Sequence, residues 1–172
     1  HPELGFEEVR TAGIVAAELD RLGIPHRDGF GKTGIVGIIE GAEPGPTLLI
    51  RADMDALPIH ERTGLPFACQ AGGKMHACGH DGHTAILMAV AQVLSEMQPR
   101  LRGTVVFIFQ PAEEGAPDGE EGGAELMLAE GVFADPRPDA VMGLHVGSNL
   151  PAGVIGYREG PAMAAVDSFT IL

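Results

Sequence analysis

Apolar side chains recur at helical spacing in three parts of the chain. The first pattern covers residues 6–22 and stops at Gly23 and Pro25, which are typical helix-ending residues. The second covers about 82–97, where Leu, Val, Ala and Leu stand at i, i+3, i+4 and i+7. A shorter third pattern covers about 123–130 and is closed by a glycine. The sequence therefore predicts three helices.

Short β-rich runs alternate with these helical patterns. Residues 35–39 and 47–50 are separated by Glu43-Pro44-Gly45-Pro46, a turn sequence, so we expect them to pair as a hairpin. Residues 104–109 (TVVFIF) are continuously apolar and β-branched or aromatic, which is typical of a strand covered on both faces. Residues 141–144 and 154–157 are predicted to be two further strands.

The alternation of strands and helices predicts an α/β fold. We expect a mixed, largely parallel central sheet with helices on both faces. In such sheets, functional sites gather just beyond the carboxyl ends of the strands. Three polar groups stand at such positions: Asp53 and Asp55, Glu113 and Glu114, and His145. We expect them to meet at one edge of the sheet.

Composition narrows the functional classes. The 172 residues include 45% hydrophobic side chains, enough for one core, and no apolar run approaches the length of a membrane span. The formal net charge of −13 disfavours nucleic acid and anionic lipid as partners. Two cysteines and no signal peptide favour the cytoplasm. The missing initial Met and the apolar C-terminal run suggest a piece of a longer protein.

The segment 75–84 (MHACGHDGHT) packs three His, one Cys and one Asp into ten residues ahead of the second predicted helix. Imidazole and thiolate are ligands that zinc, manganese, cobalt and nickel accept, and Cys78 and His80 are close enough to serve neighbouring coordination positions. The alternative is a polar loop in which Asp81 or Thr84 caps the helix without a metal.

The three polar groups also admit structural explanations. Glu113 and Glu114 can bind a cation and take a proton from water, or they can belong to a solvated acidic loop. Asp53 and Asp55 alternate and project to one side if the strand continues, or they form a plain turn. A lone histidine such as His145 is more often a satisfied core residue than a ligand.

Four motifs occur in the order "RADMDALP", "GKMHACGHDGHTA", "FQPAEEG" and "GLHVG". Together they resemble the metal-dependent amidohydrolase and aminoacylase peptidase family, which contains N-acyl-amino-acid deacylases, hippurate hydrolases and indole-acetyl-amino-acid hydrolases. The likeness covers essentially the whole chain. It implies a zinc-exopeptidase-like catalytic domain, here truncated, and hydrolysis of the amide bond of N-acyl amino acids.

The resemblance also implies site roles. Cys78 becomes a bridging thiolate ligand, and His80, Glu114 and His145 become further metal ligands. Glu113 becomes the general base. Relatives in the wider superfamily have His-x-Asp where this chain has Asp53-Met54-Asp55, so His80 is expected to replace that histidine and Asp55 to orient a ligand.

The family pattern implies features beyond the site. We expect residues 1–165 to form part of the catalytic metal-binding domain and residues 166–172 to begin a lid and dimerisation domain. One more metal-binding His would lie beyond Leu172. The implied cofactors are two divalent metal ions per complete subunit, zinc, manganese, nickel or cobalt. The implied partners are a small N-acyl amino acid substrate and, in the full-length protein, a second subunit of a homodimer.

Two other functions stay open. The first is a thiol hydrolase with Cys78 as the nucleophile and His80 or His83 as its base. Residues so close in sequence rarely meet in the geometry that such a pair needs. The second is a truncated, non-catalytic metal-binding module, and for the 172-residue chain by itself we expect no activity.

Overall fold

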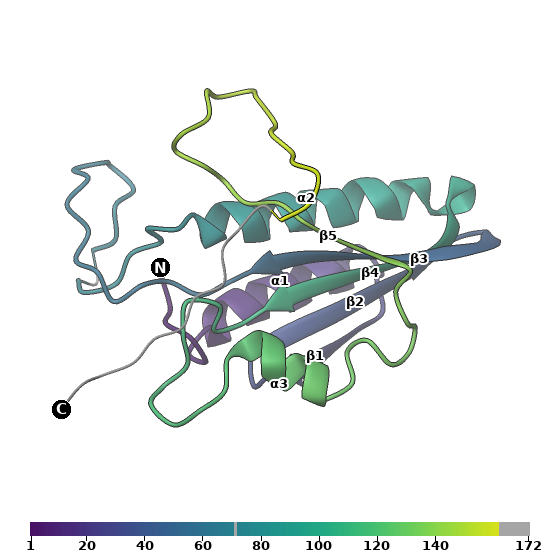
Figure 1. The fold of residues 1–172 in the computed structure, drawn as a ribbon, viewed down its shortest axis with the longest axis horizontal. Coiled ribbons are helices and arrows are strands. Elements are labelled where there is room, and N and C mark those ends of the chain that lie inside the picture. Colours follow the sequence, from purple (N-terminus) through teal and green to yellow (C-terminus); the bar gives the residue numbers. More distant parts are fainter. Residues whose placement is uncertain (71, 162–172) are drawn as a thin grey trace.

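The computed structural model describes residues 1–70 and 72–161. In chain order, its elements are α1 (Val9–Arg21), β1 (His26–Phe30), β2 (Gly34–Glu40), β3 (Glu43–Asp53), α2 (His80–Met97), the short 3-10 helix η1 (Gln98–Arg100), β4 (Arg102–Gln110), α3 (Gly123–Ala129) and β5 (Ala140–Gly143). Figure 1 shows these elements along the chain. The α/β fold predicted from the sequence is confirmed.

The strands form one mixed sheet in the order β1-β2-β4-β3-β5. β1 pairs with β2 and β2 with β4 in antiparallel fashion, whereas β3 pairs with β4 and with β5 in parallel. The crossover from β3 to β4 contains α2, and the crossover from β4 to β5 contains α3. Three parallel strands therefore end at the same edge of the sheet.

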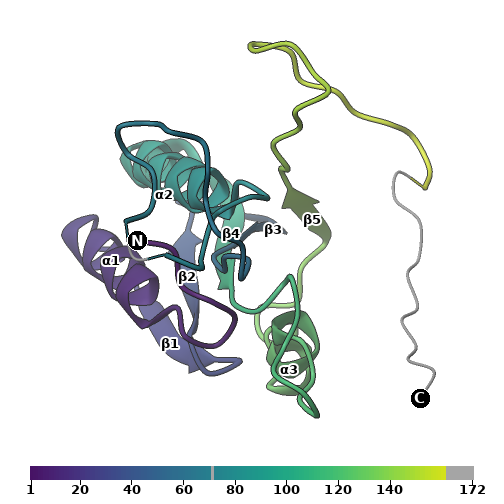
Figure 2. The same cartoon turned by 90° about the vertical axis from the view of Figure 1, so that its left-hand side faces the viewer.

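Helices cover both faces of the sheet, as predicted. α1 and α2 lie on one face and α3 lies on the other (Figure 2). On the first face, Val15 and Leu19 of α1 and Leu87 of α2 join one cluster of buried side chains with Phe107 and Phe109 of β4. On the second face, a separate cluster is formed by Val36, Leu49, Val106, Ile108, Met127 and Val132. β4 contributes to both clusters, which is why its sequence is continuously apolar.

The predicted hairpin of residues 35–39 and 47–50 is wrong. Both runs are strands, but β4 lies between them, antiparallel to β2 and parallel to β3. The start of β3, where its register with β4 shifts, passes the start of β4 at close range. A Cβ on Gly45 would lie 2.7 Å from the Gly103 nitrogen, so glycine is needed for this backbone approach. β2 instead forms its hairpin with β1, a polar edge strand that the apolar pattern does not reveal.

A second correction concerns residues 154–157, which form no strand in the described part of the chain. Their apolar side chains are exposed, and their backbone pairs with no strand among the described residues. The expected lid segment, residues 166–172, lies outside the described residues. Among the helices that are described, none combines the length and apolar composition that crossing a bilayer needs.

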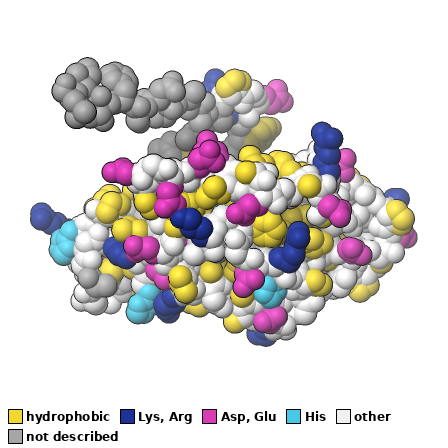
Figure 3. Space-filling view, turned by 90° about the horizontal axis from the view of Figure 1, so that it is seen from below, with side chains coloured by type: hydrophobic (Ala, Val, Ile, Leu, Met, Phe, Trp, Pro, Cys, Tyr) yellow, Lys and Arg dark blue, Asp and Glu magenta, His cyan; other side chains and the backbone are white. Residues whose placement is uncertain are grey.

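The face seen from below in Figure 1 is the side that carries α3. Figure 3 shows that hydrophobic side chains reach the surface there in several patches, between acidic and basic side chains. Leu128 of α3 and Phe133 just after it are among the exposed hydrophobic residues. Most of the buried polar side chains lie at the edge of the sheet where the parallel strands β3, β4 and β5 end.

Candidate metal centre

Parallel strand ends and one helix start converge on a single site. Asp53 is the last residue of β3, and Glu113 follows the end of β4 by three residues. His145 follows the end of β5 by two residues, and His80 is the first residue of α2. The helix begins two residues earlier than the sequence pattern predicts, which places His80 in its first turn. The expected convergence of the three polar groups is confirmed.

His80 lies at the centre of the site and is fully buried. Its Nδ1 lies 3.1 Å from Asp55 Oδ1, so Nδ1–H donates to this carboxylate. Its Nε2 is buried and, among residues 1–70 and 72–161, has no hydrogen-bond partner, while oxygens of Asp53, Glu114 and Glu113 lie 3.6, 3.7 and 3.8 Å away. In the neutral imidazole with its proton on Nδ1, Nε2 keeps its lone pair and faces the carboxylates, which is the arrangement of a metal ligand whose other nitrogen is fixed by a carboxylate.

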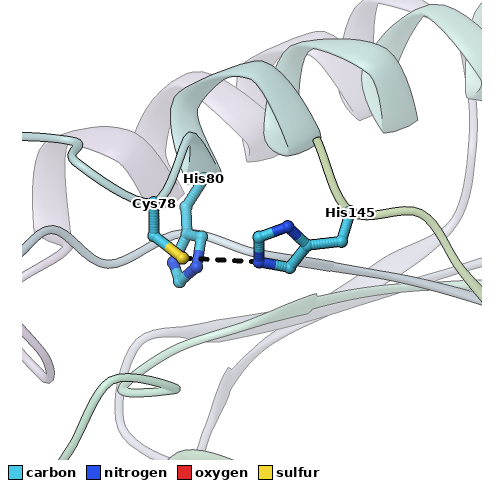
Figure 4. Close-up of side chains that lie close together, drawn as sticks. All are labelled: Cys78, His80 and His145. Atoms are coloured by element: carbon cyan, nitrogen blue, oxygen red, sulfur yellow. Dashed lines mark hydrogen bonds between the residues drawn. The ribbon is translucent and has the colours of Figure 1, made fainter. Parts of the chain in front are cut away.

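Cys78 and His145 meet next to His80. The Cys78 sulfur lies 3.3 Å from His145 Nε2, and the two side chains point toward each other from segments 67 positions apart (Figure 4). His145 Nδ1 lies 2.7 Å from the Val146 carbonyl oxygen, so Nδ1–H donates there and Nε2 keeps its lone pair. Donor atoms of Cys78, His80 and His145 all lie within 4.8 Å of one another, as do those of His80, Glu113 and Glu114.

The charges of the site call for a cation. Burial, then the hydrogen bond and charge of Glu114 and the charge of Glu113, raise the pKa of the Cys78 thiol to about 12. The protein alone therefore keeps this sulfur protonated. A divalent cation supplies the positive charge that deprotonates a coordinating thiol. The donor set of thiol, two imidazoles and carboxylates thus fits a borderline-soft divalent metal such as zinc.

Asp55 links the imidazole to the glutamate pair. One oxygen faces His80 Nδ1, and the other accepts the Glu114 N–H at 2.9 Å. Burial alone would raise the pKa of Asp55, but the hydrogen bonds from His80 and from the Glu114 and Glu113 amides outweigh it and lower the pKa. For His80, burial would lower the pKa, and the Asp55 hydrogen bond with the nearby carboxylates raises it instead. Asp55 is therefore an ionised acceptor that orients His80.

A second buried pair, Asp53 and His83, lies next to the site and was not predicted from the sequence. Asp53 Oδ1 lies 2.6 Å from His83 Nδ1, and Asp53 Oδ2 accepts from Arg51 at 2.7 Å. His83 Nε2 accepts the Val146 N–H at 2.9 Å, so this pair supports the segment that carries His145. The available signal was spacing: His80 and His83 stand at i and i+3 on one helix, and Asp53 alternates with Asp55.

The thiol-hydrolase alternative assigned the base to His80 or His83. The structure places a different imidazole, that of His145, beside the Cys78 sulfur. Both ring nitrogens of His83 are hydrogen-bonded, one to Asp53 and the other to the Val146 N–H, and His80 Nδ1 is hydrogen-bonded to Asp55. Within the described residues, neither of the two histidines named for that mechanism is hydrogen-bonded to the sulfur.

Sequence comparisons find relatives along the whole chain. N-acetylcysteine deacetylase of Bacillus subtilis is 46% identical over 177 residues, covering 100% of this chain and 44% of the relative. N-acyl-L-amino acid amidohydrolase of Geobacillus stearothermophilus is 45% identical over 171 residues, covering 99% of this chain and 45% of the relative. The chain therefore spans less than half the length of these curated relatives.

A solved structure shares the fold. The crystal structure of a Bacillus subtilis protein described as a dinuclear metal-binding peptidase of the M20 family matches with a TM-score of 0.85 and 47% identity, covering 94% of this chain and 43% of that one. The sequence profile of peptidase family M20/M25/M40 matches residues 49–169, which include every candidate site residue from Asp53 to His145. The resemblance stated from the four motifs is confirmed, and the chain belongs to peptidase family M20/M25/M40.

Proposed function

We propose that this chain is the catalytic part of a metal-dependent amidohydrolase that cleaves N-acyl amino acids to a carboxylic acid and a free amino acid. The observation that carries the proposal is the buried His80 Nε2, which has no hydrogen-bond partner in the part of the chain that the structure describes and faces carboxylates next to the Cys78–His145 contact. Relatives named N-acetylcysteine deacetylase and N-acyl-L-amino acid amidohydrolase support the substrate class.

In this proposal, Cys78, His80, Glu114 and His145 hold divalent metal, two ions per complete subunit. Zinc, manganese, nickel and cobalt all suit thiolate, imidazole and carboxylate ligands. When bound, a divalent ion polarises a carbonyl group and lowers the pKa of water. Asp55 keeps the His80 lone pair directed at the site through the bond to Nδ1.

Glu113 is the proposed general base. Its side chain is 38% exposed, whereas Asp53, Asp55 and His80 are buried, so it lies at the open rim where water and substrate arrive. Its carboxylate lies 3.8 Å from His80 Nε2, close to the proposed ligands. Glu113 takes a proton from the attacking water and returns it to the departing amine, so that the products leave as an acid and a neutral amine.

We also propose that residues 1–165 are part of the catalytic domain and that residues 166–172 begin a lid and dimerisation domain of a longer protein. The chain covers 44% and 45% of two relatives, which supports a longer protein. In this proposal the full-length protein is a cytoplasmic homodimer, and the two free thiols of Cys69 and Cys78 agree with a reducing compartment. Light scattering on the full-length protein tests the dimer, and a monomer would contradict it.

The test of the activity is a panel of N-acyl amino acids, including hippurate and N-acetyl amino acids, offered to the full-length protein that carries this sequence. Each divalent metal is added in turn after chelation. We expect release of free amino acid that disappears with chelator and returns with metal. Absence of hydrolysis with every metal and every acyl amino acid would refute the proposal.

The contact between Cys78 and His145 keeps a thiol hydrolase as the second candidate. The two candidates differ in their need for metal. A thiol hydrolase retains activity after chelation and loses it after alkylation of the metal-free protein. The metal-dependent enzyme is already inactive at the chelation step.

A further inference from the structure

The N-terminal segment 3–8 lies against the strand ends that carry Asp55 and Glu113. The Glu3 carbonyl oxygen accepts the Ala56 N–H at 2.7 Å, and Leu4 forms an isolated parallel bridge with Ala56. Ala56 directly follows Asp55. One end of this segment is therefore joined to the end of β3.

The other end of the segment holds the turn after β4. Glu8 is fully buried, although it is a carboxylic acid. Its Oε1 accepts the Ala112 N–H at 2.8 Å, and its Oε2 accepts the Thr33 hydroxyl at 2.6 Å. Ala112 directly precedes Glu113 and has φ 44°, in the left-handed region that alanine rarely adopts. A strained residue of this kind persists where its surroundings hold it in place.

Gly5 brings the segment into close contact with the same turn. A Cβ at Gly5 would lie 2.7 Å from the Gly115 carbonyl oxygen and 3.0 Å from the Ala112 Cβ. No side chain fits there without moving the turn. The segment and the turn therefore fit together at van der Waals distance over residues 112–115.

We infer that residues 3–8 form a platform that positions the Glu113 carboxylate, with Glu8 as a positioning residue. Two buried carboxylates hold the amides on either side of Glu113: Glu8 accepts from Ala112, and Asp55 accepts from Glu114. The backbone of the proposed base is thereby fixed at both flanks. Fixing matters because a displacement of about 1 Å in a catalytic group costs on the order of 100-fold in rate. The inference rests on the proposed role of Glu113.

Substitutions at Glu8 distinguish its hydrogen bonds to the turn from its negative charge. Burial raises the pKa of Glu8, more than the hydrogen bonds of Thr33 and Ala112 lower it. Glu8→Gln keeps an oxygen for the Ala112 amide and an NH₂ group that donates to the Thr33 hydroxyl. Glu8→Met fills a similar volume and provides no oxygen acceptor. Glu7→Met is the matched control, because Glu7 is exposed and bonds to Lys74 instead.

The test measures kcat, KM, bound metal and amide hydrogen exchange in the full-length, metal-loaded protein. For Glu8→Met we expect kcat to fall by about 10- to 100-fold, with KM within about twofold and metal content unchanged. Exchange over residues 110–115 should accelerate, because the Ala112 amide loses its acceptor. Glu8→Gln should stay within about threefold of the wild type in kcat, and Glu7→Met should match it.

Several results would overturn the inference. A folded Glu8→Met variant with wild-type kcat and unchanged exchange would do so, as would equal losses in Glu8→Gln and Glu8→Met. If Glu8→Met does not fold, Gly5→Ala tests the contact between the N-terminal segment and the turn after β4. An unchanged kcat in Gly5→Ala would also overturn the inference. A wild-type protein that hydrolyses no N-acyl amino acid refutes the proposed function instead. In that case, the amide exchange rates of residues 110–115 alone test whether Glu8 holds this turn.

Discussion

Removing the Asp53 carboxylate tests the buried pair that supports the site. Asp53 is fully buried and receives hydrogen bonds from His83 at 2.6 Å and from Arg51 at 2.7 Å. Asp53→Ala leaves His83 Nδ1–H without an acceptor in a place that water hardly reaches, since His83 is 2% exposed. Arg51 is less affected, because it keeps its bond to Gln110 and is partly exposed.

The magnitude follows from these contacts. A buried donor left without a partner costs about 1–3 kcal/mol, and a hydrogen bond to a charged group contributes about 1.5–3 kcal/mol. Partial rehydration of Arg51 recovers some of this, so we expect the free energy of unfolding to fall by about 2–4 kcal/mol. Asp53→Asn keeps an oxygen for His83 but turns an NH₂ group toward Arg51, so its loss should be about 1–2 kcal/mol.

Urea unfolding of the metal-free protein measures these differences. Asp28→Ala is the control, because Asp28 is an exposed residue of β1 and its replacement should change stability by less than about 0.5 kcal/mol. The order expected is Asp28→Ala, Asp53→Asn and Asp53→Ala, from the smallest loss to the largest. Equal stability of Asp53→Ala and Asp28→Ala would show that the Asp53 carboxylate does not stabilise the fold.

Three other predictions address chemistry and pH. Glu113→Gln should keep its bound metal, measured by mass spectrometry, and lose about 10²- to 10⁴-fold in kcat; retained hydrolysis would remove Glu113 as the base. Burial raises the pKa of Glu8 above its ordinary 4.5, so the free energy of unfolding should fall as pH rises from about 4.5 through the raised pKa. Glu8→Gln should flatten this part of the stability curve, and a curve that keeps its slope would contradict the assignment. Chelation should abolish hydrolysis, whereas activity in metal-free protein would favour the Cys78 thiol mechanism.

Regular periodicity made much of the fold predictable. α1, α2 and α3 bury one face each, and β4 is covered on both faces, so their patterns are visible in the sequence. β1 carries few apolar side chains because it is an edge strand, and it left no such pattern. The order of β2, β4 and β3 depends on a pairing between distant segments, which the local turn sequence after β2 does not encode.

The residues of the site could be predicted from the sequence, but the hydrogen bonds that connect them could not. The density of His and Cys at 75–84 and the acids after buried strands indicated a metal site, and the structure brings those side chains together. The sequence does not show which side chains form hydrogen bonds with each other. Glu8 lies 104 positions before Ala112, and only the folded chain brings them into contact.

X-ray absorption spectroscopy of the zinc-loaded protein, compared with the Cys78→Ser variant, tests whether Cys78 and the neighbouring side chains bind a metal ion. We expect one sulfur scatterer at about 2.3 Å together with nitrogen or oxygen scatterers at about 2.0–2.2 Å, and loss of the sulfur signal in the variant. A zinc environment without sulfur in the wild-type protein would contradict this expectation.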